Sequence, residues 1–190
     1  MLKELKLAVA FTMVTMLLFG GAYPLLLWGI GRVAFAEAAN GSLLRRADGT
    51  VIGSRLIAQS FSAPQYFHPR PSAVDYNAAS TGGSNYGPSN PDHIKAVQDR
   101  LASIRHAEGV AATQVSSEMV TTSGGGLDPH IPPNAAALQV ARVATARGVD
   151  AGRVRAIVEA HIEPPTFGIL GRARVNVLEL NLALDQALNK

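Results

Sequence analysis

The sequence has no cysteine among its 190 residues. This absence excludes a disulfide framework, a zinc site built on thiolates and a cysteine nucleophile. The chain also lacks the phosphate-binding loop G-x-x-x-x-G-K-S/T, so nothing in it indicates that it hydrolyses nucleotides by itself. The patterns H-E-x-x-H and G-x-S-x-G and the EF-hand loop are missing as well. We therefore predict no catalytic residues and no metal site.

Net charge is also small. The 17 basic and 14 acidic side chains leave a formal charge of +3. Nucleic-acid binding needs a clustered basic face, and so small an excess does not support it. Hydrophobic residues make up 47% of the chain and charged residues 16%, a composition too apolar for a disordered protein. None of the five histidines pairs with another at the spacing of metal ligands on one helix: His68, His93, His106, His130 and His161.

The N-terminal region contains a long run without charge. Between Lys6 and Arg32 lie 25 uncharged and mostly apolar residues. As a helix with a rise of about 1.5 Å per residue they reach roughly 37 Å, which exceeds the hydrocarbon core of about 30 Å. Lys3 and Lys6 precede the run, and the positive-inside rule then places the N-terminus in the cytoplasm. We predict a cytoplasmic N-terminus at 1–6, a transmembrane helix at 7–31 and an extracytoplasmic domain at 32–190.

A cleaved signal peptide is the alternative interpretation of this region. The tripeptide Ala34-Phe35-Ala36 resembles a cleavage site between small residues. The apolar run is far longer than the roughly 7–15 residues of a signal peptide, which favours an uncleaved anchor. Both interpretations export the rest of the chain.

The apolar run also contains small residues and a proline. Pro24 has no backbone N–H and tends to kink a helix. Gly20, Gly21 and the hydroxyl group of Thr12 suit a helix that packs closely on another membrane helix. Ordinary tolerance of glycine and proline in membrane helices explains the same residues equally well.

The pattern after the run predicts an α+β protein, with a single N-terminal transmembrane helix and one mixed domain. A hairpin is expected around the turn dipeptide Asp48-Gly49, followed by a strand at 56–58 and a long folded loop at 62–90. Helices are expected from the cap at Asn90 to Gly109, over 134–147, and from Asp150 onward. A last strand is expected at 175–177. The leucines of 178–184 alternate as in a strand, but residues 183–188 also suit a helix, so we expect a strand that turns into a C-terminal helix.

Two glycine-rich stretches are candidate binding loops. The first contains Gly82, Gly83, Ser84 and Asn85, and the second covers 123–130. Either can form a nest of backbone amides that binds an anion. The alternative, which glycine clusters favour in general, is a tight turn.

A third candidate is the segment 66–72, which combines aromatic residues, an arginine and two prolines. It is either a rigid recognition surface or a loop braced by proline against the core. A serine hydrolase triad can also be assembled from Ser84 or Ser123, from His68 or His130, and from Asp128. A triad is defined by geometry, and any chain of this length offers such a set.

In these segments the sequence resembles the C subunit of the bacterial Kdp potassium-transporting ATPase. The similarity runs through nearly the whole chain, and the order and spacing of its parts are more specific than any one part. The matching stretches are 23–25, 40–43, 53–61, 66–73, 82–85, 89–91, 123–128, 142–147 and 175–185. Gly125 departs from the serine or alanine expected there, which loosens that loop.

The resemblance implies a non-catalytic, single-pass subunit of a bacterial inner-membrane complex for high-affinity, ATP-driven potassium uptake. Its implied partners are a channel-like potassium-translocating subunit, a P-type ATPase subunit, a small single-helix stabilising subunit and membrane lipid. It also implies a role in assembly and stability, and a chaperone role that raises the ATP affinity of the pump subunit. No tightly bound cofactor is implied, but ATP contact is, and we assign it to Gly82, Gly83, Ser84 and Asn85.

Topology stands against that nucleotide contact. ATP is cytoplasmic, whereas the charge rule exports the domain, so the coupling is indirect or the orientation is inverted. The predicted partner contacts are Thr12, Gly20, Gly21, Pro24, His68, Arg70, Ser123 and Asp128. The rival functions are a membrane-tethered periplasmic serine hydrolase and a stand-alone periplasmic binding module.

Overall fold

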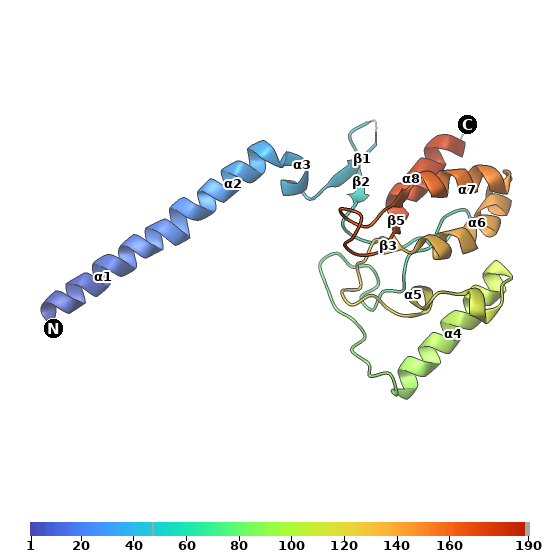
Figure 1. Cartoon of the computed structure of the whole chain (residues 1–190), viewed down its shortest axis with the longest axis horizontal. Helices are drawn as coiled ribbons and strands as arrows, with labels where there is room; N and C mark the ends of the chain where they lie inside the picture. Colours follow the sequence, from blue (N-terminus) through green and yellow to red (C-terminus); the bar gives the residue numbers. More distant parts are fainter. Residues whose placement is uncertain (47, 189–190) are drawn as a thin grey trace. The chain divides into compact units, whose positions relative to one another are not determined.

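The computed structural model describes residues 1–46 and 48–188. These residues form two compact units that divide after Leu43 (Figure 1). The first unit is helical, and the second combines helices with short strands. The predicted α+β class and the single long apolar helix are therefore confirmed.

The first unit consists of one nearly continuous helix and a short helical turn. Residues 2–34 are helical throughout and are long and apolar enough to cross a membrane. The parts are α1 (Leu2–Leu17), the π-helical segment η1 (Leu18–Ala22), α2 (Tyr23–Ala34) and α3 (Ala36–Ala39). The predicted span of 7–31 lies inside this helix, and its insertion and orientation stay predictions.

The π-helical segment lies directly before Pro24. Tyr23 donates its backbone N–H to Leu18 O, five residues back. Pro24 cannot donate, and its ring presses on the carbonyl one turn earlier, so a wider turn relieves the strain. Gly20 and Gly21 both lie in this wider turn, and a Cβ built on either would have no atom within 4 Å. At this place the apolar helix therefore has a wider turn, and its surface at Gly20 and Gly21 carries no side chain.

The predicted hairpin follows, and all of its residues except Leu43 belong to the second unit. Strand β1 (Leu43–Arg45) pairs with β2 (Val51–Ser54). Asp48 Oδ1 accepts a 2.8 Å hydrogen bond from Thr50 N and holds the turn. The predicted strand at 56–58 is wrong, because this stretch is a turn whose one long-range backbone bond runs from Ala58 N to Leu127 O.

The segment 62–90 has neither helix nor strand, as predicted. It is nevertheless folded, because Phe67 is completely buried. Helix α4 (Pro91–Glu108) follows it, with Asn90 Oδ1 capping Asp92 N at 2.8 Å. Helix α4 packs on α5 and α6 but has no fully buried residue.

Three helices and a small sheet enclose the core of the second unit. The sheet has the antiparallel order β3-β5-β4, with Val175 opposite both Ile131 and Ile162. Two of the helices match the predictions at 134–147 and after Asp150, which caps Gly152 N. The remaining elements are η2 (Ala112–Gln114), α5 (Ser117–Val120), β3 (His130–Ile131), α6 (Pro133–Arg147), α7 (Ala151–Ala160), β4 (Ile162–Glu163), β5 (Arg174–Asn176) and α8 (Val177–Leu188).

The expected continuation of the last strand beyond residue 177 is wrong. Asn176 Oδ1 accepts hydrogen bonds from Leu178 N and Glu179 N, at 3.1 and 3.2 Å, and so acts as a helix cap. The cap converts the chain to α8 at once. Within α8, Val177, Leu180 and Leu184 are buried at helical spacing, which outweighs the period-two pattern.

Candidate functional site

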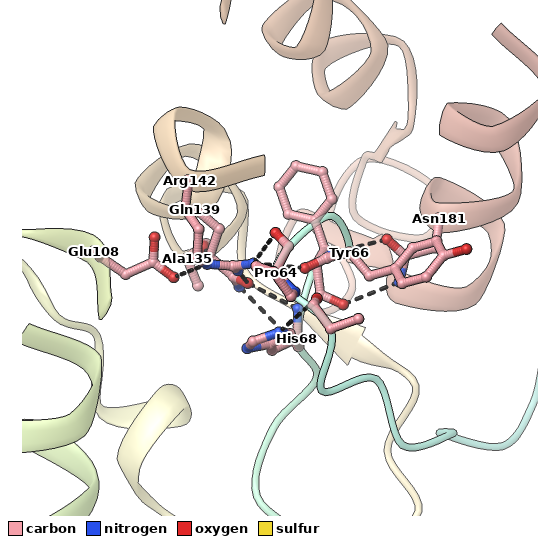
Figure 2. A network of polar contacts seen from close by, with 10 residues as sticks. Pro64, Tyr66, His68, Glu108, Ala135, Gln139, Arg142 and Asn181 are labelled. Carbon is pink, nitrogen blue, oxygen red and sulfur yellow. Dashed lines mark hydrogen bonds and ion pairs between the residues drawn. The ribbon is translucent and has the colours of Figure 1, made fainter. Parts of the chain in front are cut away.

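The backbone of residues 64–68 is held by side chains instead of a neighbouring strand (Figure 2). Asn181 on α8 accepts a hydrogen bond from Phe67 N at 2.8 Å and donates one to Phe67 O at 3.0 Å. Gln139 on α6 accepts from His68 N at 2.8 Å and donates to His68 O at 3.2 Å. Both amide side chains are 1% exposed. Each therefore satisfies a buried peptide group as a strand partner would.

Two arginines take the remaining carbonyl groups of this segment. Arg142 Nη1 donates to Pro64 O at 2.6 Å and to Tyr66 O at 2.9 Å. Arg147 Nε donates to Gln65 O at 2.8 Å. We call Gln139, Arg142, Arg147 and Asn181 the clamp. Because the clamp residues come from α6 and α8, the segment 64–68 is fixed to the helical core.

The arginines of the clamp are paired with acidic groups. Arg142 Nε lies 2.8 Å from Glu108 Oε1, and Arg147 Nη2 lies 2.8 Å from Asp185 Oδ1. The guanidinium of Arg147 also lies 5.1 Å from the centre of the Tyr66 ring. Burial, together with the nearby Asp185 carboxylate, raises the pKa of the Tyr66 hydroxyl, which donates to Asp185 Oδ2 at 3.1 Å. The ring therefore stays neutral and serves as a platform.

A cleft of about 390 Å³ lies between α4 and the end of this segment. His68, Tyr76, Arg100 and Glu108 contribute polar groups to its lining. Glu108 Oε2 is buried and has no hydrogen-bond partner among the described residues. Burial and the nearby Arg142 charge lower the pKa of His68, so its ring is neutral at pH 7. Its Nε2 lies 3.2 Å from Ala63 O, and a carbonyl accepts, so the proton is on Nε2.

A second charged cluster lies just after the segment, around Arg70. Arg70 Nη1 is 3.0 Å from Asp128 Oδ2, and Asp128 Oδ1 accepts from His130 N at 3.0 Å. His130 Nδ1 lies 3.4 Å from the same Oδ1. Burial opposes ionisation of Asp128, but the bonds from His130 and Arg70 outweigh it and hold its pKa below the usual value. Asp128 is therefore a fixed negative charge between two basic groups.

The two glycine-rich stretches lie against each other. Gly82 N donates to Gly125 O at 3.0 Å, and Thr81 Oγ1 donates to the same oxygen at 3.1 Å. Gly126 has a φ of +71°, and a Cβ there would lie 2.7 Å from Val74 Cγ2. Only glycine adopts this positive φ without strain and has no Cβ to collide with Val74. The stretches are thus parts of one packed loop pair.

The structure brings several predicted site residues together. His68 is the last residue of the clamped segment, Arg70 lies two residues after it, and Ser123 N donates to Pro71 O at 3.3 Å. Asp128 joins them through Arg70. Gly82 and Gly83 lie on the paired loop, where a Cβ on Gly83 would be 3.0 Å from Gly124 O. The membrane candidates Thr12, Gly20, Gly21 and Pro24 all lie in the apolar helix of the first unit. The roles assigned to these residues stay predictions.

The hydrolase triad is not assembled by this geometry. Asp128 and His130 are close, but the hydroxyl of Ser84 lies 3.3 Å from Thr122 Oγ1. No hydrogen bond links Ser84 or Ser123 to a histidine within residues 1–46 and 48–188. In the same part of the chain, no three His, Asp or Glu side chains are grouped so that they could hold a metal ion.

The clamp was not predicted from the sequence. A signal was present, because Gln139 and Asn181 interrupt the apolar faces of their helices and are buried there. Buried amides need partners, and here the partner is a loop backbone. The partner lies more than 70 residues away in the sequence for Gln139, and more than 110 for Asn181, so pattern alone does not reveal it.

Comparisons with known proteins agree on one family. Residues 5–186 match the family described as K+-transporting ATPase, c chain, or KdpC. The potassium-transporting ATPase KdpC subunit of Pseudomonas aeruginosa is 51% identical over 185 residues, covering 97% of each chain. The subunit so named in Cereibacter sphaeroides is 49% identical over 187 residues, covering 98% of this chain and 99% of that protein. The subunit so named in Geobacter sulfurreducens is 46% identical over 187 residues, covering 97% of this chain and 98% of that protein.

The chain therefore belongs to the KdpC family. This membership confirms the resemblance of its motifs to the C subunit of the Kdp potassium-transporting ATPase.

Proposed function

We propose that the chain is an accessory subunit without catalytic activity of its own, needed for assembly and stability of the potassium-importing complex. The observation that carries the proposal is the family match along nearly the whole chain, from the apolar helix to α8. The clamp supports it, because its two arginines donate to the backbone of a loop and so have a structural role. The proposed neighbours are a channel-like subunit, a P-type ATPase subunit and a small single-helix subunit.

The anchor is proposed to dock on a membrane helix of the complex through Gly20 and Gly21. The π-helical turn leaves this surface without side chains, and close backbone approach is what membrane helix packing requires. Pro24 fixes the position of the irregular turn, and Thr12 lies two turns away on the same helix.

Replacement of both glycines tests this docking. The double variant Gly20→Leu, Gly21→Leu should lower recovery of the other subunits when the tagged full chain is isolated from membranes in detergent. The matched control is Ala8→Leu, Ala10→Leu, which adds the same residues to the regular part of α1, where both alanines are also exposed. Equal recovery of the complex with both double variants would refute the docking surface.

We propose that the effect on ATP affinity reaches the pump subunit indirectly. By the positive-inside rule, Lys3 and Lys6 favour an orientation in which the second unit lies outside, away from cytoplasmic ATP. A direct contact at Gly83, Ser84 and Asn85 has one supporting feature: their backbone amides donate to no other described residue. Such unpaired amides are what an anion nest needs, so this contact becomes the better proposal if the orientation is inverted.

Protease added to intact spheroplasts separates the two routes. With an exported second unit, a C-terminal tag should be trimmed without lysis, while a cytoplasmic control protein stays whole. A tag protected until lysis would refute the orientation and with it the indirect route. Recovery of the complex in the pull-down is independent of this result.

A further inference from the structure

The cleft between α4 and the loop that contains the clamped segment has the size and the wall of a small-molecule site. Its volume of about 390 Å³ falls within the roughly 300–1,000 Å³ that is usual for such sites. We call it the α4 cleft. Much of its wall is apolar, and a wall of this kind favours a ligand with an apolar body over a bare ion. The residues of this apolar part are Phe61, Pro69, Pro71, Ile104, Ala107 and Met119.

Arg100 brings a positive charge to the wall of the α4 cleft. Its Nη1 donates to Val120 O at 3.0 Å, and no carboxylate of the described residues forms an ion pair with it. In the same part of the chain, none of its guanidinium nitrogens is buried without a partner, so its remaining N–H groups reach solvent. A guanidinium has several N–H donors in a planar fork that fits a carboxylate, so Arg100 can hold an anion in the cleft.

No other charge in the lining offsets that of Arg100 among the residues that the structure describes. Glu108 Oε1 is already paired with Arg142, as the dashed line in Figure 2 shows, and its Oε2 is closed to solvent. His68 is neutral at pH 7, and Asp75 is exposed and outside the lining. The cleft therefore suits a ligand with a single negative charge. A phosphate group carries about −1.5 to −2 at pH 7 and would leave part of its charge unpaired there.

We propose that the α4 cleft binds a small organic acid that has one carboxylate and an apolar body. The carboxylate accepts hydrogen bonds from the guanidinium of Arg100, and the body packs on Phe61, Ile104 and Met119. Helix α4 has no fully buried residue over Pro91–Glu108, so a ligand that fills the cleft adds contacts that hold this helix against the loop. The inference goes beyond the proposed function, because it concerns a ligand of the chain itself and requires no co-subunit.

A pair of probes tests the class of ligand. Binding of 3-phenylpropionate to the full chain in detergent is measured by titration with saturation-transfer NMR. The uncharged 3-phenylpropionamide has the same apolar body and should bind at least about tenfold more weakly, because the charge-assisted hydrogen bond is lost. Equal binding of the two probes, or no binding of 3-phenylpropionate, would overturn the proposal.

Variants of α4 test the site. Arg100→Gln should weaken binding of 3-phenylpropionate at least about tenfold, whereas Arg105→Gln, at an exposed position of α4 outside the lining, should leave it unchanged. Arg100→Gln also gives up the bond to Val120 O, so a second variant keeps the guanidinium. Ser103→Phe fills the cleft from an exposed position of α4 and should abolish binding. Wild-type affinity in either Arg100→Gln or Ser103→Phe would refute the site.

Hydrogen exchange of the wild-type chain locates the bound probe. Saturating 3-phenylpropionate should slow exchange of the α4 amides and leave those of α7 unchanged. Slower exchange only outside α4 would put the ligand elsewhere, and the proposal would be wrong. Recovery of co-subunits in the pull-down does not depend on this ligand, so failure here leaves the proposed function standing.

Discussion

Glu108, the last residue of α4, and Arg142, in the middle of α6, form an ion pair with Nε 2.8 Å from Oε1, although their side chains are only 5% and 10% exposed. Removing two charges from water is costly, and further hydrogen bonds to the charged groups offset part of that cost. Arg142 makes three more bonds, to Pro64 O, Tyr66 O and Gln139 Oε1. One guanidinium therefore joins α4, α6 and the loop.

Arg142→Met should destabilise the second unit by about 3–5 kcal/mol, because it leaves the Glu108 carboxylate buried without its partner. The two loop carbonyls lose their donor at the same time. Denaturant unfolding of the full chain in detergent, followed by circular dichroism, measures the loss. The double variant Arg142→Met, Glu108→Met should recover part of it, because the unpaired charge is gone.

Arg155→Met is the matched control for this substitution. Arg155 is exposed on α7, and no described residue pairs with it. The free energy of unfolding of Arg155→Met should therefore stay within about 0.5 kcal/mol of wild type. A loss of similar size in Arg142→Met and Arg155→Met would contradict the assigned role.

Asn181→Leu should also destabilise the second unit, while keeping nearly the same side-chain volume. The N–H and the C=O of Phe67 would both lose their partner in a buried site, at a cost of about 1–3 kcal/mol for each group. Hydrogen exchange should show much faster exchange of the Phe67 amide. Gln186→Leu, on the exposed face of α8, should change neither the stability nor this amide.

The elements with local signals were predictable from the sequence. The cap at Asn90 and the stop at Gly109 fixed α4, and Asp150 fixed the start of α7, because capping depends on residues next to one another. The long apolar helix was equally clear, since its length and composition need no tertiary context.

The elements that depend on distant partners were missed. Strand β5 ends at Asn176, and α8 begins at the next residue because the Asn176 side chain caps the helix. The alternating leucines gave no sign of this cap. The clamp is a set of contacts between residues far apart in the sequence, so only the fold reveals it. The candidate segment 66–72 was identified, but the residues that hold it were not.

Gly126→Ala should destabilise the protein by more than the ordinary cost of a left-handed alanine, which is about 1–2 kcal/mol. The new methyl group would lie 2.7 Å from Val74 Cγ2 and 2.9 Å from Gly82 O, so the two glycine loops must move apart. Gly148→Ala is the matched control, because it has a similar φ of +64° and open space around the Cβ position. The difference in melting temperature between the two variants measures the packing of the loop pair, and equal losses would show that the loops do not depend on close approach.

His68 should make the second unit less stable as the pH falls from 7.5 to 5. Burial and the Arg142 charge lower the pKa of His68 in the folded protein below its ordinary value of about 6.5. In that pH window the unfolded chain binds the proton and the folded chain does not, so stability is full at pH 7.5 and declines on acidification. His68→Gln removes this linkage and leaves the backbone bonds to Gln139 in place, so its melting temperature should fall less between pH 7.5 and 5 than that of wild type. His106→Gln, at an exposed position of α4, should keep the wild-type slope. The lowered pKa of Asp128 keeps that carboxylate ionised throughout this range, so Asp128 does not contribute to the pH dependence. If His68→Gln has the same pH dependence of the melting temperature as wild type, the His68 ring is not held neutral in the folded protein.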